Sequence, residues 1–290
     1  MKTVNISHFD LGGVTCAMFL RKAFGNITTY MIGYDDIEET LKRISDDCHV
    51  IITDINLNGR NIDGLKNFQK VTIIDHHLTT IKFDEQYDVI IDTARCGAWL
   101  TYEWLVKERI LPKSIWFDEW AKYVDDHDRW IHQYPQSKQI NAYLHVLKDK
   151  NKFIAEASGK TPNELIADNL TMITEYIKLR EAYVKETYCY DISEGDDKVG
   201  VVFADRNASD VGDYYVRQKN FDLVYIINLG NGRVSLRSKI GGVNSMKVAE
   251  KFGGGGHQAS AGFLLSRDMV CPMIGALGLR TKNLPRRKIE

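Results

Sequence analysis

The sequence lacks the cysteine pattern of a zinc, redox or disulfide-stapled protein. Its five cysteines are odd in number, and none forms a CxxC pair. We therefore expect all five to be free thiols buried in a reduced protein: Cys16, Cys48, Cys96, Cys189 and Cys271.

Long apolar runs and a leader are also missing. No segment approaches the roughly 20 apolar residues that span a bilayer. The first residues, MKTVNISHFD, lack the basic region and apolar run of a signal peptide. These absences predict a cytoplasmic protein without a membrane partner.

An excess of basic charge is absent as well. The 38 Lys and Arg residues against 39 Asp and Glu residues give a net charge of −1. An overall basic field of the kind that gathers long nucleic acid is thereby excluded, so any polyanion must be bound locally. The 290 residues, 44% of them apolar, are enough for two ordinary domains.

The first half of the chain alternates short apolar runs with helical patterns. The runs cover residues 4–6, 29–32, 50–53, 71–74 and 89–91, and helical spacing recurs over residues 13–24 and 98–110. This alternation predicts an α/β fold with a mostly parallel sheet flanked by helices. We place this first domain at residues 1–160.

The second half has a different organisation. Few helix breakers interrupt residues 162–190, which predicts one long helix inside a helical linker at 161–191. Turn-rich residues 193–197 then precede strand-like runs at 199–204, 223–229 and 233–240, a short helical pattern at 246–252 and a glycine tract. We expect a smaller α/β domain at 192–270 and a frayed tail at 271–290.

Acidic and imidazole side chains follow three of the predicted strands. In an open parallel sheet, ligands gather outside the carboxyl ends of the strands. A lone aspartate there is usually a helix cap or turn residue, but three strand ends of this kind in one chain favour a metal site. Imidazole and carboxylate ligands without cysteine favour Mn²⁺. The candidate ligands are His8 and Asp10 after the first strand, Asp54 after the third, and Asp75-His76-His77 after the fourth.

These segments resemble the motifs of the DHH phosphoesterases. Asp75-His76-His77 is the signature that names this superfamily, SHFDLGG at residues 7–13 is similar to its first motif, SHxDxDG, and IITD at 51–54 is similar to its second. HDRW at 127–130 resembles the YDTW segment of the oligoribonuclease branch of the NrnA and NrnB type. On that basis we select Asp128 over Asp125 and Asp126 as the fourth-motif residue.

The resemblance implies a set of site residues and two divalent metal ions, Mn²⁺ with Co²⁺ as the alternative. One ion would be held by His8, Asp10 and Asp54, and the second by Asp54, His76 and Asp128. His77 would face the substrate phosphate, so Asp54 and His77 are the expected catalytic residues. Two such ions would clamp a phosphoryl group and activate water.

The first motif departs from the family pattern at Gly12. The family has a second aspartate there, which belongs to the second metal ion, and glycine offers no side-chain ligand. The resemblance therefore implies a weakened second site, because losing even an outer-shell partner costs about 10–100-fold in metal affinity or activity. Natural divergence and an inactivating substitution both remain open.

The glycine tract FGGGGHQASAGF at residues 252–263 is the second motif-rich region. Consecutive glycines let backbone N–H groups approach an anion, although a bare glycine run is more often a flexible turn. With the preceding strand at 234–238, it resembles the substrate-binding DHH-associated domain. The resemblance implies that Arg237, Gly255, Gly256 and His257 bind substrate together with His77.

The sequence thus predicts a hydrolase, a metal-dependent phosphodiesterase acting on short oligoribonucleotides. A linearised cyclic dinucleotide or 3′-phosphoadenosine phosphate is the next candidate substrate, and Trp130 and Phe263 are candidates for stacking on a base. The rival interpretation is a nucleotide-binding protein that has lost catalysis through Gly12. A homodimer is left open.

Overall fold

The computed structural model describes residues 1–25, 27–79, 81–266 and 268–269. The chain divides into two units between Lys178 and Leu179, which lies inside the predicted linker at 161–191. The predicted tail at 271–290 and Cys271 lie outside the described residues. Each unit is considered by itself.

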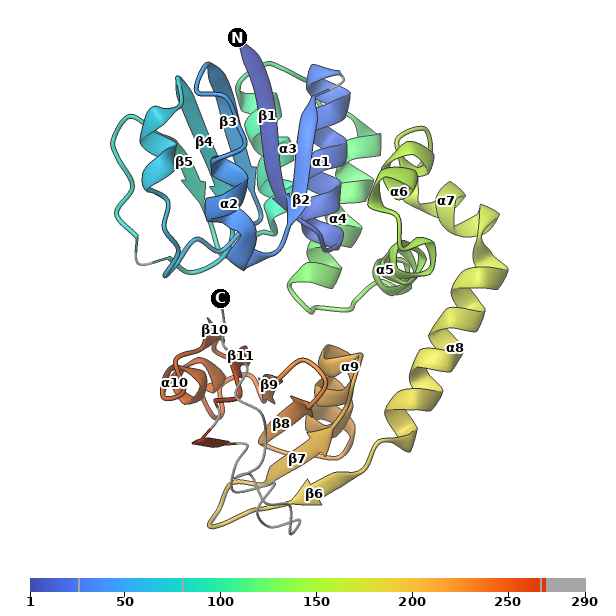
Figure 1. The fold of residues 1–290 in the computed structure, drawn as a ribbon. Helices are drawn as coiled ribbons and strands as arrows, with labels where there is room; N and C mark the ends of the chain where they lie inside the picture. Colours follow the sequence, from blue (N-terminus) through green and yellow to red (C-terminus); the bar gives the residue numbers. More distant parts are fainter. Residues whose placement is uncertain (26, 80, 267, 270–290) are drawn as a thin grey trace. The chain divides into compact units, whose positions relative to one another are not determined.

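The first unit is built on a five-stranded, all-parallel sheet, in agreement with the predicted fold class (Figure 1). The strand order is β2-β1-β3-β4-β5, so β1, β3 and β4 are neighbours at its centre. These three strands are buried almost throughout, as their β-branched apolar residues require. The strands are β1 (Lys2–His8), β2 (Thr28–Ile32), β3 (Cys48–Thr53), β4 (Lys70–Asp75) and β5 (Asp88–Ile91).

Each face of this sheet has its own apolar core. Ile51 and Ile74 point to the face that packs against α1 (Leu11–Phe24), α3 (Gly97–Lys107) and α4 (Ile115–Asp128). Ile52 and Ile73, one residue along each strand, point to the opposite face and pack with α2 (Ile37–Leu41). The alternation of side chains along a strand therefore places helices on both faces. Two short 3₁₀ turns, Tyr34–Asp36 and Asp63–Asn67, complete this unit's connections.

A helical region follows the sheet, and here one prediction was wrong. The expected single helix over 162–190 is two helices, α7 (Pro162–Asp168) and α8 (Leu170–Glu186), after α5 (Pro135–Leu147) and α6 (Lys150–Ala157). Thr161 and Glu164 form a capping box at the start of α7, with Pro162 in its first turn. Asn169 ends it, because its side-chain amide donates to the Leu165 carbonyl at 2.9 Å. The last residues of the range form a strand instead.

The second unit contains a six-stranded sheet with the order β10-β11-β9-β8-β7-β6. Among its described strands, only β7 and β8 pair in parallel. Helix α8 crosses the division of the chain: Ile173 packs in the first unit's core and Val184 in the second's. The elements are β6 (Cys189–Asp191), β7 (Val199–Phe203), α9 (Ala208–Asp213), a π-turn (Tyr214–Gln218), β8 (Leu223–Asn228), β9 (Arg233–Ser238), α10 (Ser245–Glu250), β10 (Gly255–His257) and β11 (Ser260–Leu264).

The cysteine and membrane expectations can be compared with the described residues. Cys16, Cys48 and Cys96 are buried free thiols, while the free thiol Cys189 is only half-buried. In the described part of the chain, no helix combines the length and apolar character needed to cross a membrane.

The first unit's core predicts a large difference between two isoleucine truncations. Ile6 is fully buried, whereas Ile115 is 77% exposed at the start of α4. Ile6→Ala should lower the free energy of unfolding by about 2–5 kcal/mol, and Ile115→Ala by less than about 0.5 kcal/mol. All five tryptophans lie before residue 131, so tryptophan fluorescence during urea unfolding reports on this unit. Equal losses for the two variants would contradict the placement of the core.

Candidate metal centre

The candidate site lies at the carboxyl edge of the central strands of the first unit. Because β1, β3 and β4 are parallel neighbours, the residues that follow them meet at one edge. His8 ends β1, Asp54 directly follows β3, and His76 directly follows β4. Asp128 comes from a different element, as the last residue of α4.

Asp54 is held in an unusual backbone conformation at this edge. Its φ of 59° is in the left-handed region, which non-glycine residues seldom adopt outside functional or turn positions. Its N–H donates to the Ile74 carbonyl at 2.9 Å, which fixes the turn after β3. Gly12 and Gly97 lie against its carboxylate, and a Cβ at either position would overlap Asp54. Two glycines thus provide the space for this side chain.

The side chains of Asp54, His76 and Asp128 converge. His76 Nε2 lies 3.3 Å from Asp54 Oδ1 and 3.3 Å from Asp128 Oδ2. Both carboxylate oxygens of Asp54, and Oδ2 of Asp128, are buried without a hydrogen-bond partner of normal geometry in the described part of the chain. Buried polar atoms nearly always have a partner, so these oxygens fit a bound divalent cation. Asp54, His76 and His77 also place one ligand atom each within 4.8 Å of one another.

Burial of like charges shifts the ionisation of this cluster. Burial and the negative charge of Asp54 raise the pKa of the Asp128 carboxyl to about 8. Burial alone would lower the pKa of His76, but the close approach of Asp54 Oδ1 to its Nε2 and the charges of Asp128 and Asp54 outweigh it and raise that pKa to about 10. A divalent cation would replace the protons that relieve this repulsion.

The three aspartates near the end of α4 have different surroundings. Asp125 accepts a hydrogen bond from the Cys96 backbone N–H at 2.7 Å. Asp126 accepts from the backbone N–H groups of Gln133 and Tyr134 at 2.8 and 3.2 Å. Both carboxylates therefore hold the chain's own backbone, and Asp128 alone of the three lies beside His76. This geometry favours the selection of Asp128.

His8 and Asp10 form a separate pair beside this cluster. His8 Nδ1 lies 2.7 Å from Asp10 Oδ2, and Asp10 Oδ1 caps α1 by accepting the Gly13 N–H at 3.1 Å. Burial opposes ionisation of Asp10, but the charge and hydrogen bond of His8 outweigh it and lower its pKa. The ring of Tyr34 stacks on His8, with centroids 4.4 Å apart.

Asp75 and Tyr34 both contact His77. Asp75 was predicted only as one of the candidate ligands after the fourth strand, and Tyr34 was not identified from sequence. Asp75 Oδ1 lies 2.7 Å from His77 Nδ1, and the Tyr34 hydroxyl lies 3.4 Å from His77 Nε2. The hydrogen bond and charge of Asp75 overcome the effect of burial and raise the pKa of His77. The signal for Tyr34 is its place in the 3₁₀ turn that follows β2, the other neighbour of β1.

The predicted substrate-binding residues of the second unit share a row of its sheet. Arg237 on β9 and His257 on β10 both pair with Ser260 on β11, so the three side chains point to one face. Arg237 is half-buried and donates to Ser209 Oγ at 2.6 Å and the Leu236 carbonyl at 2.9 Å. Burial lowers its pKa to about 10. Ser260 was not identified from sequence.

The second half of the glycine tract, from Gly255, is a strand, and two of the glycines allow close contact. A Cβ at Gly254 would overlap the Gly262 carbonyl, and one at Gly256, which has φ of 145°, would lie 2.5 Å from Ala261 Cα. A Cβ at Gly255 would meet no atom within 4 Å. The expected flexible or nest-like segment is therefore, from Gly255 onward, an ordered edge strand, with Gly255 as its open position.

The two aromatic residues considered for base stacking differ. Phe263 is buried in the second unit's core and stacks on Phe252 with centroids 4.6 Å apart, so the stacking hypothesis was wrong for this residue. Trp130 is half-buried and packs against His132 at 4.3 Å, just beyond Asp128. Its position near the metal centre leaves its predicted role open to test.

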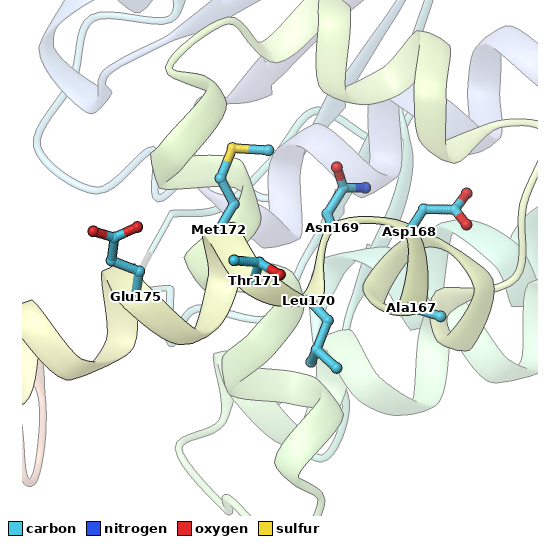
Figure 2. Close-up of a pocket in the computed structure, with 7 residues that line it drawn as sticks. All are labelled: Ala167, Asp168, Asn169, Leu170, Thr171, Met172 and Glu175. Atoms are coloured by element: carbon cyan, nitrogen blue, oxygen red, sulfur yellow. The ribbon is translucent and has the colours of Figure 1, made fainter.

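A pocket elsewhere in the first unit contains none of the predicted site residues. It lies at the break between α7 and α8, where one asparagine, one threonine and two acidic residues are mixed with apolar side chains (Figure 2). Its lining contains no histidine, arginine or lysine, so it offers no cation for a phosphate. The lining residues are Ala167, Asp168, Asn169, Leu170, Thr171, Met172 and Glu175.

Comparisons with known proteins agree with this architecture. No family model matches the sequence. The oligoribonuclease NrnB of Bacillus subtilis is 25% identical over 88% of this chain and 71% of its own length. A crystal structure of exonuclease RecJ bound to manganese has a TM-score of 0.64 at 15% identity, covering 95% of this chain and 88% of that one. A pGpG-specific phosphodiesterase from Vibrio cholerae has a TM-score of 0.54 at 13% identity, covering 96% and 97%. The structural likenesses show the fold.

Two asparagine substitutions should separate metal binding from structural support. The raised pKa of Asp128 means that its ionisation costs the metal-free protein stability, increasingly as pH rises from about 4 through about 8. Asp128→Asn should therefore raise the melting temperature of the metal-free protein at pH 9 and abolish the further rise that Mn²⁺ gives. Thermal unfolding with and without Mn²⁺ measures both effects.

Asp126→Asn is the matched control. It weakens two backbone hydrogen bonds and should cost about 1–3 kcal/mol of stability while keeping the Mn²⁺-dependent rise. Loss of that rise in Asp126→Asn, or its survival in Asp128→Asn, would show that the fourth-motif residue has been misassigned.

Proposed function

Because the chain belongs to the DHH superfamily of phosphoesterases, we propose that it is a metal-dependent phosphodiesterase that hydrolyses short oligoribonucleotides. The observation that carries this proposal is the convergence of Asp54, His76 and Asp128. Three of the carboxylate oxygens are buried without a hydrogen-bond partner of normal geometry among the described residues. These residues would hold a divalent ion, with His8 and Asp10 beside them. Mn²⁺ is the proposed metal and Co²⁺ the alternative.

The metal supplies the chemistry that the side chains lack. When bound, a divalent ion polarises a phosphoryl oxygen and lowers the pKa of water, which provides a nucleophile at neutral pH. The chain's own contribution is orientation and charge. Asp75 and Tyr34 hold the two ring nitrogens of His77, and its raised pKa favours the imidazolium. A cationic His77 would stabilise the negative charge that grows on the phosphate in the transition state.

The second unit would bind the neighbouring nucleotide. Arg237 and His257 lie in one row across the sheet, and the Arg237 guanidinium has two nitrogens committed to Ser209 and the Leu236 carbonyl. No carboxylate hydrogen-bonds to Arg237 among the described residues, so its charge is available to a phosphate. Gly255 leaves open space beside this row.

Short substrates fit the charge of the molecule. With a net charge of −1, the protein has no broad basic surface along which a long strand could be held. The relatives act on small substrates by name, one as an oligoribonuclease and one as a pGpG-specific phosphodiesterase. Oligoribonucleotides of a few units are therefore the leading substrate class, with linear dinucleotides such as pGpG next.

A nucleotide-binding protein without catalysis is the second candidate function. Gly12 favours it, because the family's aspartate at this position is absent. The convergence of the remaining ligands argues for an enzyme, since their burial costs stability and has no structural use without a cation.

An assay with labelled RNA tests the proposal. Mn²⁺-dependent cleavage should occur with a dinucleotide and a pentanucleotide and be much weaker with a long single strand. His77→Gln removes the imidazolium and should lower kcat by about 10²–10³-fold. His145→Gln is the matched control, because His145 packs on Tyr176 in the helical region, and it should keep full activity.

The other outcomes separate the two candidate functions. Binding of the dinucleotide without cleavage under any divalent metal would support the nucleotide-binding alternative. Neither binding nor cleavage of any of these RNAs would reject the oligoribonucleotide assignment.

A further inference from the structure

Helix α9 covers part of the sheet face to which Arg237 points. Val224 on β8 and Val211 on α9 belong to the same apolar core. Arg237 is the register partner of Val224, so its side chain points to the face that α9 covers. On its other side in this row, Arg237 is followed by Ser260 and then His257. The guanidinium therefore belongs to the border between the helix and the predicted substrate-binding row.

Gly212 allows α9 to lie against the stem of Arg237. A Cβ at Gly212 would overlap Arg237 Cγ and lie 2.8 Å from Arg237 Cβ. Arg237 Cβ is bonded directly to the backbone of β9, so rotation of the side chain cannot move this atom away. A larger residue at position 212 would have to shift the helix or the strand. Such a shift would also displace the other α9 residue that contacts Arg237.

That residue is Ser209, about one turn before Gly212 on the helix. Its hydroxyl accepts a hydrogen bond from Arg237 Nη2 at 2.6 Å, and the Leu236 carbonyl accepts one from Nη1 at 2.9 Å. Because the guanidinium is planar, bonds at both terminal nitrogens fix its orientation. A hydroxyl and a carbonyl are neutral acceptors, so the positive charge is not cancelled. Further N–H donors of the same group remain for an anion.

Two carboxylates of α9 act on this charge from nearby, and each is paired with another arginine. Asp210 accepts a hydrogen bond from Arg180 Nε on α8 at 2.9 Å. Asp213 Oδ1 lies 2.7 Å from Arg217 Nε. Burial lowers the pKa of Arg237, and the charges of Asp210 and Asp213 oppose this effect. The two arginine partners therefore compensate the carboxylates that would otherwise attract Arg237.

From this packing we infer that α9 positions Arg237 to bind a phosphate group of the substrate. Ser209 directs the guanidinium, and Gly212 permits the close approach of the helix that this contact needs. Arg180 acts indirectly, because it holds Asp210 in an ion pair of its own. The inference rests on the proposed function, in which the second unit binds a nucleotide. All of these positioning residues lie outside the sequence motifs that pointed to Arg237.

Binding of a 5′-phosphorylated RNA dinucleotide to the full chain tests the role of Ser209. Isothermal titration calorimetry in EDTA measures the affinity without cleavage. Ser209→Ala should weaken binding about 3–10-fold, because one terminal nitrogen loses its acceptor. Ser209→Thr keeps a hydroxyl and should recover most of the affinity. Ser209→Asp should weaken binding more than Ser209→Ala, because its carboxylate would neutralise Arg237.

Ser193→Ala is the matched control for these variants. The Ser193 hydroxyl accepts a hydrogen bond from the Val199 N–H at 2.9 Å, between β6 and β7 at the opposite edge of the same sheet. This variant should bind the dinucleotide as the unaltered chain does. Gly212→Ala should weaken binding, whereas Gly159→Ala, where a Cβ meets no atom within 4 Å, should not. Circular dichroism confirms that each variant is folded.

A pair of variants separates charge compensation from structural support by the Arg180–Asp210 ion pair. Arg180→Met should weaken dinucleotide binding, because Asp210 is then free to compete for Arg237. Adding Asp210→Asn to Arg180→Met should restore binding, although the ion pair is still missing. A purely structural ion pair predicts no such recovery, and that result would overturn the role of Arg180.

The outcomes distinguish this inference from the proposed function. Equal binding by the unaltered chain and Ser209→Ala would reject the positioning role and leave the function standing. Variants that bind as expected, without RNA cleavage under any divalent metal, would reject only the activity. Failure of the unaltered chain to bind the dinucleotide would reject both.

Discussion

The candidate metal centre depends on the parallel pairing of β1, β3 and β4. Parallel neighbours end at the same edge, so residues far apart in sequence, such as His8, Asp54 and His76, are brought together by backbone hydrogen bonding alone. An apolar core packs against each face of the sheet and holds these strands in place. Asp128, in contrast, does not follow a strand. It ends α4, and the packing of α4 on α1 and α3 places it at this edge.

The same arrangement lowers the stability of the metal-free chain. The carboxylates of Asp54 and Asp128 lie close together, and their negative charges repel each other. The raised pKa values of Asp128 and His76 favour the protonated forms, which reduces this repulsion. Neighbouring acids show what a structural role looks like: Asp125 and Asp126 are also buried, but backbone N–H groups satisfy them. Whether a buried carboxylate has hydrogen-bond partners therefore distinguishes a structural aspartate from a candidate ligand more clearly than burial alone does.

Strand positions and the edge residues could be predicted from sequence because apolar runs and their polar ends are local signals. The five predicted runs of the first half all lie within β1 to β5. What escaped prediction depends on distant contacts. Tyr34 enters the site through the neighbouring strand, Ser260 through the register of β11, and Asn169 breaks the expected helix by a side-chain hydrogen bond to the Leu165 carbonyl. Periodicity carries no information about such pairings.

Glycines show most clearly how a motif residue takes its meaning from its neighbours. Gly254 and Gly256 permit β10 and β11 to approach closely, so part of a tract that looks flexible is an ordered strand. At Gly12 the missing side chain looks like a lost ligand when the motif is read alone. In the structure the same absence leaves room for two carboxylates, because a Cβ at Gly12 would overlap Asp54 Oδ2 and lie 2.9 Å from Asp128 Oδ2. The effect of a departure from a family motif therefore depends on the packing around that position as well as on the ligand that is lost.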